Sequence, residues 1–377
     1  MTAISSKNLH LRLNFLDSMK DDYCVIMAGG VGSRFWPVST QKTPKQFLDI
    51  LGTGESLLQL TCKRVQKIVP LQNILVVTNE EYCDLVKQQL PNLPEQNILA
   101  EPVRRNTAPC ITYAAFRIKK ESPDASMIIT PSDHLITDED AYIARLKEAL
   151  NYSRNNDYLI TLGIKPTRPE TGYGYIQYKD LQDEVDLKKV KTFTEKPDAE
   201  HAKMFIESGD FLWNSGVFIW NVDTLLNNLK KHLPDVFEAF NDGWDKYNSP
   251  DEAAFIQTIY PQCLNVSIDY GLMEKAENVF VLPAEFGWSD LGTWTSVNEK
   301  LALDEHENAF IGKKILLYNS KNCLVVNQGK KLIVAEGLDG YVIAEGEKAI
   351  LIYPKNKEQE IKGVVNDVRA KWGEAHI

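Results

Sequence analysis

The chain has 377 residues, of which 44% are hydrophobic and 10% aromatic, which is enough for one large domain with a substantial core and a smaller second domain. Its formal net charge of -10 argues against a general nucleic-acid or anionic-membrane surface, because such surfaces carry a basic stripe. Any polyphosphate ligand would therefore need a local cationic pocket.

The cysteines and the N-terminus predict a cytoplasmic protein. The six cysteines are scattered and form no CxxC pair, which is typical of reduced, buried thiols. No stretch has the continuous apolar length of a signal peptide or a membrane span. Residues 1–18 precede the first apolar run, and we expect them to form an N-terminal extension.

Short apolar runs alternate with segments of helical periodicity through the first part of the chain. The apolar runs predict strands at 23–27, 74–78, 126–130 and 158–163. The periodic segments between them predict helices at 56–68, 80–90, 108–119 and 138–152. This alternation predicts an α/β fold with a Rossmann-like mixed, mainly parallel sheet flanked by helices. Ligands of such sheets bind beyond the carboxyl ends of the strands.

The pattern of predicted secondary structure changes twice further along the chain. From about residue 172, short polar strands, turns and aromatic clusters predict a mixed insertion that folds over the same sheet. A helical segment at 295–303 is followed, from about 308 to 365, by one short strand after another. We therefore expect a catalytic domain over 19–300 and a small β-rich C-terminal domain over 301–377, with a short left-handed β-helix as one form it could take.

A glycine-rich loop follows the first predicted strand and contains Gly29, Gly30 and Gly32. It lacks the third glycine of a dinucleotide-binding fingerprint and the Gly-Lys-Ser/Thr of a Walker loop. Its bare N–H groups can still reach a phosphate chain, and Arg34 and Lys45 supply cations on its flank. A plain chain-reversing turn is the alternative for the glycines alone.

Two aspartates, each in a Ser-Asp pair after an apolar segment, indicate a metal site. Asp133 directly follows the strand predicted at 126–130, and Asp290 lies far downstream in "GWSDLGTW". Their carboxylates could share one Mg²⁺ that also binds substrate phosphates. The alternatives are a helix N-cap for Asp133, or a glycosidase acid and base, which would leave the phosphate loop unused. We expect His134 to be a packed neighbour rather than a ligand.

Eight motifs, taken in order, resemble those of a known enzyme family. They are "AGGVGSRFWPVST...PKQF", "EPVRRNTAP", "PSDH", "GYGYI", "FTEKP", "WNSGVF", "SIDYGLMEK" and "GWSDLGTW". Over roughly residues 23 to 300 they are similar to the mannose-1-phosphate guanylyltransferases of the sugar nucleotidyltransferase family. The resemblance implies Mg²⁺-dependent transfer of GMP from GTP to α-D-mannose 1-phosphate, which gives GDP-mannose and pyrophosphate without a covalent intermediate. It also implies, by analogy, a homodimer.

The resemblance assigns roles to individual residues. The nucleotide phosphates would be bound by Gly29, Gly30, Gly32, Ser33 and Arg34. Arg34 and Lys45 would be the catalytic cations, and Asp133 and Asp290 would bind Mg²⁺. The nucleobase and ribose would face Asn106, Thr107 and the backbone near Ser132. The sugar phosphate would be bound by Gly174, Glu195, Lys196, Asn214 and Asp269.

Several alternatives stay open from the sequence. Glu195 with Lys196 could be an exposed ion pair, residues 214–216 a turn, and Asp269 a helix cap. Arg104 stands where the family usually has glycine, close to the base-binding loop, so nucleobase selectivity is the least constrained assignment. A related enzyme for another sugar or base, and a non-catalytic subunit that senses nucleotide sugars, are the rival functions.

Overall fold

The structure is a computed structural model that describes residues 22–30, 32–179, 186–329 and 331–377. The N-terminal extension expected at 1–18 lies outside these described residues. The chain forms two compact units. The sheet unit comprises the chain up to Gly29, Cys62–Pro131 and Ile136–Trp288, and the C-terminal unit comprises Gly30–Thr61, Ser132–Leu135 and Ser289–Ile377. The C-terminal unit thus includes residues 30–61 and 132–135, which the expected boundaries had grouped with residues 19–300.

Among the described residues, the sheet unit contains one nine-stranded sheet with the order β3-β2-β1-β4-β9-β6-β10-β8-β7. Its strands are β1 (Asp22–Met27), β2 (Ile74–Asn79), β3 (Ile98–Glu101), β4 (Ser126–Pro131), β6 (Leu159–Ile164), β7 (Gly174–Lys179), β8 (Lys188–Glu195), β9 (Phe211–Asn221) and β10 (Val279–Ala284). β1 to β4 pair in parallel, and β9 runs antiparallel to both β4 and β6. The expected mixed sheet and the four strands predicted from apolar runs are confirmed.

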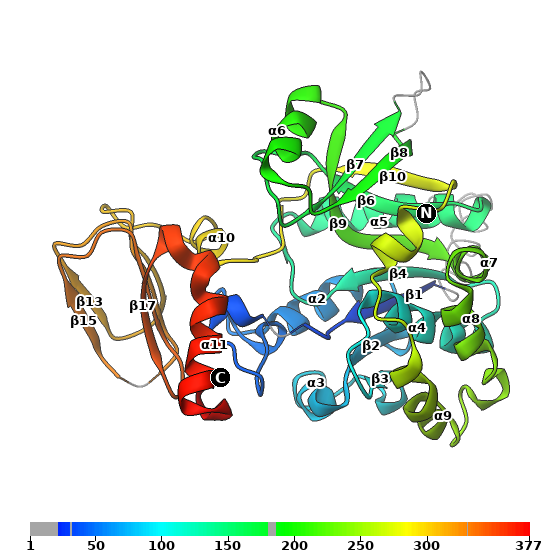
Figure 1. Ribbon diagram of the computed structural model, residues 1–377, viewed down its shortest axis with the longest axis horizontal. Coiled ribbons are helices and arrows are strands. Elements are labelled where there is room, and N and C mark those ends of the chain that lie inside the picture. The colour runs from blue at the N-terminus through cyan, green and yellow to red at the C-terminus, as the bar shows by residue number, and fades with distance from the viewer. Residues whose placement is uncertain (1–21, 31, 180–185, 330) are drawn as a thin grey trace, which may run out of the picture. The chain divides into compact units, whose positions relative to one another are not determined.

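Helices surround this sheet, as Figure 1 shows. They are α3 (Cys83–Gln89), α4 (Thr107–Glu121), α5 (Glu139–Asn155), α6 (Ala199–Ser208), α7 (Val222–His232), α8 (Pro234–Asn241) and α9 (Glu252–Ile259). The chain crosses from the C-terminal unit into the sheet unit within the helix α2 (Leu57–Val65). It crosses between the same units again within the short strands β5 (Leu135–Ile136) and β11 (Trp288–Ser289). None of the described helices has the length and apolar character needed to cross a membrane.

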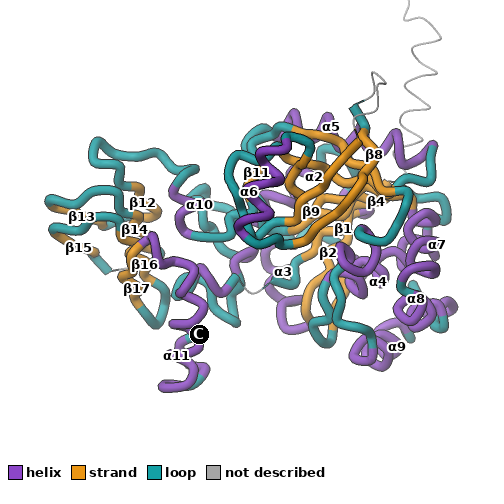
Figure 2. Tube along the Cα trace, turned by 45° about the horizontal axis from the view of Figure 1, so that its top comes forward, coloured by secondary structure: helices purple, strands orange, loops and turns teal. Residues whose placement is uncertain are grey.

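Alternate residues of β4 explain why helices cover both faces of the sheet. Met127 and Ile129 belong to the same buried core as residues of α4 and α7. Ser126 points to the other face, where its hydroxyl accepts a hydrogen bond from Ser153 Oγ of α5 at 3.2 Å. Figure 2 shows the strands between α4 and α5. Because both faces are buried, the strands appear in the sequence as continuous apolar runs.

Short parallel strands dominate the end of the C-terminal unit. They are β12 (Ala309–Gly312), β13 (Ile315–Tyr318), β14 (Leu324–Asn327), β15 (Ile333–Glu336) and β16 (Tyr341–Glu345), followed by the antiparallel β17 (Ile350–Pro354). β12, β14 and β16 pair in parallel in one sheet, while β13 and β15 pair in parallel in another. The chain alternates between the two sheets as a short coil of parallel strands does, and this confirms the expected β-rich C-terminal region.

The sequence pattern failed to predict the helix that follows these strands. Strands were expected to about residue 365, but α11 (Ile361–Trp372) begins four residues earlier and runs alongside β17 in Figure 1. Its β-branched residues Val364 and Val365 are typical of strands, although Ile361 and Val365 lie four residues apart on one buried helical face. The helix expected at 295–303 is also shorter in the structure, where α10 spans Trp294–Asn298.

Candidate active site

A small pocket in the C-terminal unit contains most of the residues predicted to bind nucleotide phosphates. It has a volume of about 250 Å³ and is lined by Gly32, Ser33, Arg34, Phe35, Lys45, Asp133, His134, Asp290, Leu291 and Gly292. This volume is below the roughly 300–1,000 Å³ of a typical small-molecule site, so the pocket has room for a phosphate chain but not for a whole nucleotide. Gly32 has a φ of 65°, which favours glycine, and it leads into the 3₁₀ turn Ser33–Phe35.

Lys45 is the fixed cation of this pocket. Its side chain is only 4% exposed, and its ammonium group donates to Asp133 Oδ2 at 3.0 Å and to the backbone carbonyl of Asp290 at 2.6 Å. The ammonium also lies 5.5 Å from the centre of the Phe35 ring. Burial opposes ionisation of Asp133, but Lys45 and His134 outweigh it and hold the pKa of this carboxyl below its ordinary value. Lys45 is therefore held in place rather than free in solvent.

The two aspartates of the pocket meet the requirements of a magnesium site in their donor chemistry. Asp133 and Asp290 both line it, and Asp290 Oδ1 accepts the Gly292 N–H at 2.9 Å, which fixes that side chain. No set of three or more His, Cys, Asp or Glu residues that could hold a metal occurs in the described part of the chain. Mg²⁺ commonly binds one or two protein carboxylates and completes its shell with phosphates and water. Two carboxylates beside a phosphate-sized pocket fit that pattern.

The alternative in which Asp133 caps a helix is wrong. The next helix, α5, begins at Glu139 and is capped by Asp138, whose carboxylate accepts the Ala141 N–H at 3.0 Å. His134 is a neighbour of Asp133, with Nε2 4.0 Å from Asp133 Oδ1.

Three other residues predicted to bind the nucleotide are divided between the two units. Gly30 belongs to the C-terminal unit, where its carbonyl accepts a hydrogen bond from Gln46 Nε2 at 2.9 Å. Ser132 lies in the same unit, is 2% exposed, and its carbonyl accepts a hydrogen bond from Thr61 Oγ1 at 3.2 Å. Gly29 belongs to the sheet unit and follows β1.

The five residues predicted to bind the sugar phosphate come together in the sheet unit. Asn214 Nδ2 donates to Asp269 Oδ1 at 2.9 Å, and Lys196 Nζ forms an ion pair with Glu195 Oε1. Gly174 of β7 pairs in register with Glu195 of β8 and leaves room for its carboxylate. The Glu195 side chain is 10% exposed, whereas that of Lys196 is 60% exposed. The pair is therefore not a plain surface salt bridge, since the carboxylate is buried and the ammonium reaches solvent.

The buried carboxyl of Asp269 has an unusual pKa. Burial, and then the negative charge of Glu195, raise the pKa of Asp269 to about 7, although Lys196 and a hydrogen bond from Asn214 act against the rise. Asp269 begins the π-helical turn Asp269–Met273, but its side chain contacts Asn214 instead of capping that turn. A strongly perturbed carboxyl in a cluster of polar groups is typical of functional sites.

Asn106 and Thr107, predicted near the nucleobase, lie at the start of α4 in the sheet unit. Asn106 has a φ of 66° and caps the helix by accepting the Thr107 N–H at 2.9 Å. Thr107 Oγ1 accepts the N–H of Ile268 at 2.8 Å. Arg104 donates to the Tyr82 hydroxyl at 2.8 Å, and its guanidinium lies 5.9 Å from the centre of the Tyr82 ring. Arg104 is therefore bound to a neighbouring side chain.

The sequence interpretation missed two polar residues close to these clusters. Glu101 ends β3, is 5% exposed and accepts a hydrogen bond from the Tyr260 hydroxyl. Burial raises the pKa of Glu101 to about 7, against hydrogen bonds from Tyr260 and Cys110. Thr161 lies inside β6, where its hydroxyl contacts Asn214. The position of Glu101 at the start of "EPVRRNTAP" was a usable signal, but a threonine in the apolar run "LITLGI" gives none.

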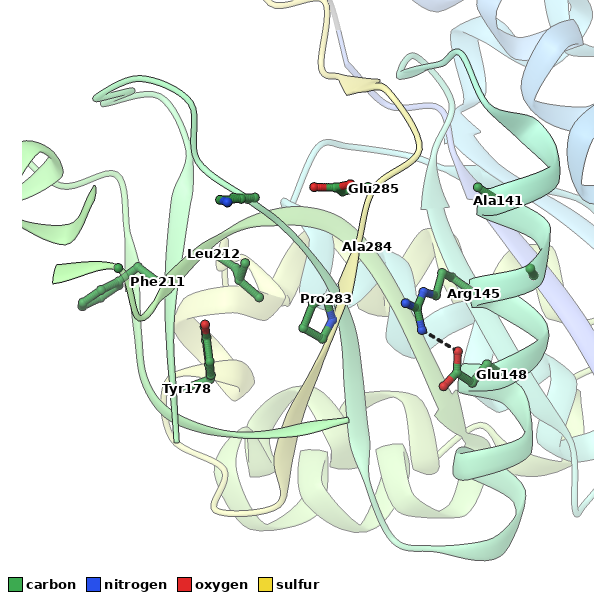
Figure 3. A pocket seen from close by; sticks show the side chains of 12 residues that line it. Ala141, Arg145, Glu148, Tyr178, Phe211, Leu212, Pro283, Ala284 and Glu285 are labelled. Atoms are coloured by element: carbon green, nitrogen blue, oxygen red, sulfur yellow. Dashed lines mark hydrogen bonds and ion pairs between the residues drawn. The ribbon is translucent and has the colours of Figure 1, made fainter. Parts of the chain in front are cut away.

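A larger pocket of about 700 Å³ lies elsewhere in the sheet unit and contains none of the predicted residues. Figure 3 shows the Arg145 guanidinium turned toward the Glu148 carboxylate on the same helix. Arg145 Nη1 is 2.8 Å from Glu148 Oε2 and 2.8 Å from Asp186 Oδ2. This arginine is therefore already paired with two carboxylates.

Comparison with known proteins supports the same chemistry. Residues 23–307 match the family described as nucleotidyl transferase. The chain is 37% identical to the alginate biosynthesis protein AlgA of Pseudomonas aeruginosa over 351 residues, which cover 92% of this chain and 72% of the relative. It is 37% identical to a mannose-1-phosphate guanylyltransferase of Klebsiella pneumoniae, with 90% of this chain and 72% of the relative covered. The crystal structure of the Thermus thermophilus protein named mannose-1-phosphate geranyltransferase matches with a TM-score of 0.83 and 31% identity, covering 93% of this chain and 99% of that one.

Proposed function

The chain belongs to the nucleotidyl transferase family, and we propose that it is a mannose-1-phosphate guanylyltransferase, which transfers GMP from GTP to α-D-mannose 1-phosphate. The observation that carries this proposal is the buried Lys45 ammonium, bonded to Asp133 and to the backbone of Asp290 in a phosphate-sized pocket. A fixed cation beside two carboxylates suits a reaction whose charge develops on phosphate oxygens. The mannose-1-phosphate guanylyltransferase of Klebsiella pneumoniae, at 37% identity, supports the choice of substrates.

The proposed reaction is a single in-line displacement. A phosphate oxygen of mannose 1-phosphate forms a bond to the α-phosphorus of GTP, the bond from that phosphorus to the bridging oxygen breaks, and pyrophosphate leaves with the electron pair. The attacking phosphate is already ionised, so no side chain needs to act as a general base. Arg34 and Lys45 neutralise charge on the triphosphate and at the α-phosphate. Mg²⁺, held by Asp133 and Asp290, would supply further neutralisation of phosphate charge.

The backbone around the glycine loop completes the phosphate site in this proposal. The N–H groups of Gly29, Gly30, Gly32 and Ser33 can bind phosphate oxygens directly, because glycine has no side chain to hold a ligand away from the backbone. The more exposed Arg34 side chain can move to contact different phosphates, whereas the buried Lys45 side chain is held in one position. In this proposal Lys45 meets the α-phosphate and Arg34 meets the outer phosphates.

The polar cluster of the sheet unit would bind the sugar phosphate. The hexose hydroxyls need both donors and acceptors, and Asn214 offers an N–H while Glu195 and Asp269 offer carboxylate oxygens. Lys196, whose side chain is 60% exposed, would meet the phosphate. Asn106, Thr107 and the backbone of Ser132 would contact the nucleoside. Arg104 is engaged by Tyr82, and guanine selectivity is therefore compatible with its presence.

A homodimer formed through the β-rich region is part of this proposal. The outer face of the β13–β15 sheet exposes Leu316, Tyr318 and Val334, each about half exposed at 48%, 53% and 55%. Large apolar side chains clustered on one sheet face are typical of protein interfaces. A cytoplasmic location also belongs to the proposal, and all six cysteines are free thiols.

Pyrophosphate release tests the proposed function. The protein is assayed with Mg²⁺ and each of GTP, ATP, dTTP and UTP against mannose 1-phosphate and glucose 1-phosphate. We expect turnover with GTP and mannose 1-phosphate, a large loss in Asp290→Asn, and no loss in Asp339→Asn, which changes an exposed aspartate of the same unit. Turnover with another pair would move the specificity to a related enzyme. Binding of GDP-mannose without any turnover would favour the non-catalytic sensor.

A further inference from the structure

Asn214 sits at an irregularity between two strands of the sheet unit. β6 and β9 pair Thr161 with Phe218, but the next paired position joins Gly163 to Asn214, so the register shifts between them. The extra residues of β9 form a bulge that includes Ser215 and Gly216, whose φ is 69°. Bulges of this kind occur beside active sites and turn a side chain in a new direction. Here the side chain that is turned is the carboxamide of Asn214.

Two groups inside the bulge contact the oxygen of that carboxamide. The Gly216 N–H donates to Asn214 Oδ1 at 3.1 Å. Thr161 Oγ1 lies 3.2 Å from the same oxygen and 3.1 Å from the carbonyl of Val217, and its one hydrogen can be shared between these two acceptors. Thr161 is fully buried. The oxygen of Asn214 is therefore directed into the sheet.

The nitrogen of the carboxamide faces the other way. Nδ2 donates one hydrogen to Asp269 Oδ1 at 2.9 Å, and among the described residues it has no second acceptor. If the amide were reversed, its NH₂ group would face the Gly216 N–H and its oxygen would face the Asp269 carboxylate, so both contacts would be lost. Asp269 alone does not fix this orientation, because a carboxyl with a pKa of about 7 is partly protonated near neutral pH and can then act as a donor.

We infer that Thr161 is a positioning residue for the sugar-phosphate site: its buried hydroxyl, with the Gly216 N–H, holds the Asn214 carboxamide so that Nδ2 faces Asp269 and the bound hexose. The inference rests on the proposed function of the Asn214 and Asp269 cluster. Thr161 itself touches no substrate. A correctly turned Asn214 places an N–H donor beside a carboxylate acceptor, and one sugar hydroxyl can use both because it donates and accepts.

Steady-state kinetics of two substitutions test this role. Thr161→Val keeps the β-branched shape that suits a strand and removes the hydroxyl, whereas Thr161→Ser keeps the hydroxyl and removes a methyl group. We expect Thr161→Val to raise the KM for mannose 1-phosphate about three- to tenfold, the size of one hydrogen bond, with the KM for GTP changed by less than about twofold. Thr161→Ser should restore the sugar KM to within about twofold of the wild type.

A matched control separates a local effect from general loosening of the fold. Thr224 Oγ1, also buried, donates to Asp157 Oδ1 at 3.2 Å, next to the amino end of β6, whereas Asn214 pairs near its carboxyl end. Thr224→Val should leave both KM values unchanged. If Thr161→Val fails to fold, Thr161→Ala is the second hydroxyl-free variant and carries the same expectation.

The inference would be overturned by a sugar KM unchanged in both hydroxyl-free variants, or by a Thr161→Ser variant no better than Thr161→Val. Equal rises in both KM values would also overturn it, because they would indicate a merely structural role. Failure of the proposed function looks different, since the wild type itself would then not turn over mannose 1-phosphate. If the wild type uses another sugar phosphate, the same comparison is made with that sugar and tests the role of Thr161 in the same way.

Discussion

Replacing Lys45 with methionine separates the chemical step from sugar binding. Methionine keeps most of the length and apolar packing of the lysine stem beside Phe35, but removes the ammonium. That ammonium makes two hydrogen bonds, at 3.0 Å to Asp133 and at 2.6 Å to the Asp290 carbonyl. Because Lys45 is buried, neither water nor another part of the same side chain can take over its charge. The substitution therefore removes one fixed positive charge from the phosphate pocket.

The expected size of the effect follows from this geometry. Loss of one preorganised group that stabilises developing charge typically lowers kcat by about 10²–10³, or about 2.7–4 kcal/mol of transition-state free energy. Stability should change far less. The Asp133 side chain is 31% exposed and can be solvated after its partner is lost, so the cost in unfolding free energy should stay below the loss of transition-state free energy. The pKa of Asp133 should rise toward its ordinary value when Lys45 is removed.

The assay measures kcat and both KM values by pyrophosphate release, beside chemical unfolding of the same samples. We expect kcat to fall about 100- to 1,000-fold while the KM for mannose 1-phosphate stays within about threefold, because the predicted sugar-binding residues contact one another and not Lys45. Lys42→Met is the matched control, since Lys42 is exposed in the same segment and should tolerate the change. Lys45→Arg should not restore activity, because a planar guanidinium does not fit a site built for an ammonium.

Either of two results would contradict this role of Lys45 in the chemical step. If kcat and sugar affinity fall by the same factor, Lys45 contributes equally to ground-state binding and has no special role at the reacting phosphate. If the unfolding free energy falls by as much as the activation free energy rises, the loss of activity reports a damaged fold.

Three further predictions concern a buried acid, an exposed sheet face and a buried aromatic ring. The pKa of Glu101 rises from 4.5 to about 7 on folding, so the folded state keeps this proton to higher pH. The unfolding free energy should therefore fall as pH rises from about 5 to 8. Urea titrations should show a flatter pH dependence for Glu101→Gln than for the wild type, and parallel curves would contradict the pKa shift. Val334→Glu, which puts a charge on the exposed β13–β15 face, should convert a dimer to a monomer in light scattering, while an unchanged mass would place the interface elsewhere. Phe35→Ala should cost about 3–5 kcal/mol of unfolding free energy, because the ring is 1% exposed and packs edge-on against Trp294 with 4.8 Å between the ring centres. A loss below about 1 kcal/mol would show that the surrounding residues close the cavity left by the ring.

Local pattern was sufficient for four strands of the sheet but not for the end of the chain. The strands β1, β2, β4 and β6 could be predicted because burial on both faces leaves continuous apolar runs. α11 could not, because Val364 and Val365 favour strand locally and the helix is stabilised by packing of Ile361 and Val365 into the core of its unit. Tertiary contacts of this kind have no local signature.

The motifs had grouped Lys45, Asp133 and Asp290 at one phosphate and metal site, but the contacts between these residues were beyond the sequence. Lys45, Asp133 and Asp290 are separated by up to 245 positions, yet Lys45 contacts both aspartates in one unit. Adjacent Gly29 and Gly30 belong to different units, although they are neighbours in one motif. The motifs predict which residues form the candidate site, but the division of the chain into two compact units depends on contacts between segments that are distant in the sequence.

The burial of individual acidic residues favours the functional interpretation over the plain one, and a substitution can test it. Glu195 would be an ordinary surface partner of Lys196 if both were exposed, but its side chain is 10% exposed and lies beside a second carboxyl, that of Asp269. Bringing two carboxylates together out of water destabilises the folded state, and the pKa of about 7 at Asp269 reflects that cost. Replacing Asp269 with asparagine would relieve the repulsion and keep the shape, so a fold selected for stability alone would gain from it. If Asp269 binds a hydroxyl of the sugar phosphate, as proposed, Asp269→Asn should raise the unfolding free energy at pH 8 and weaken sugar-phosphate binding. A variant that gains stability and keeps full affinity would return Asp269 to the plain interpretation.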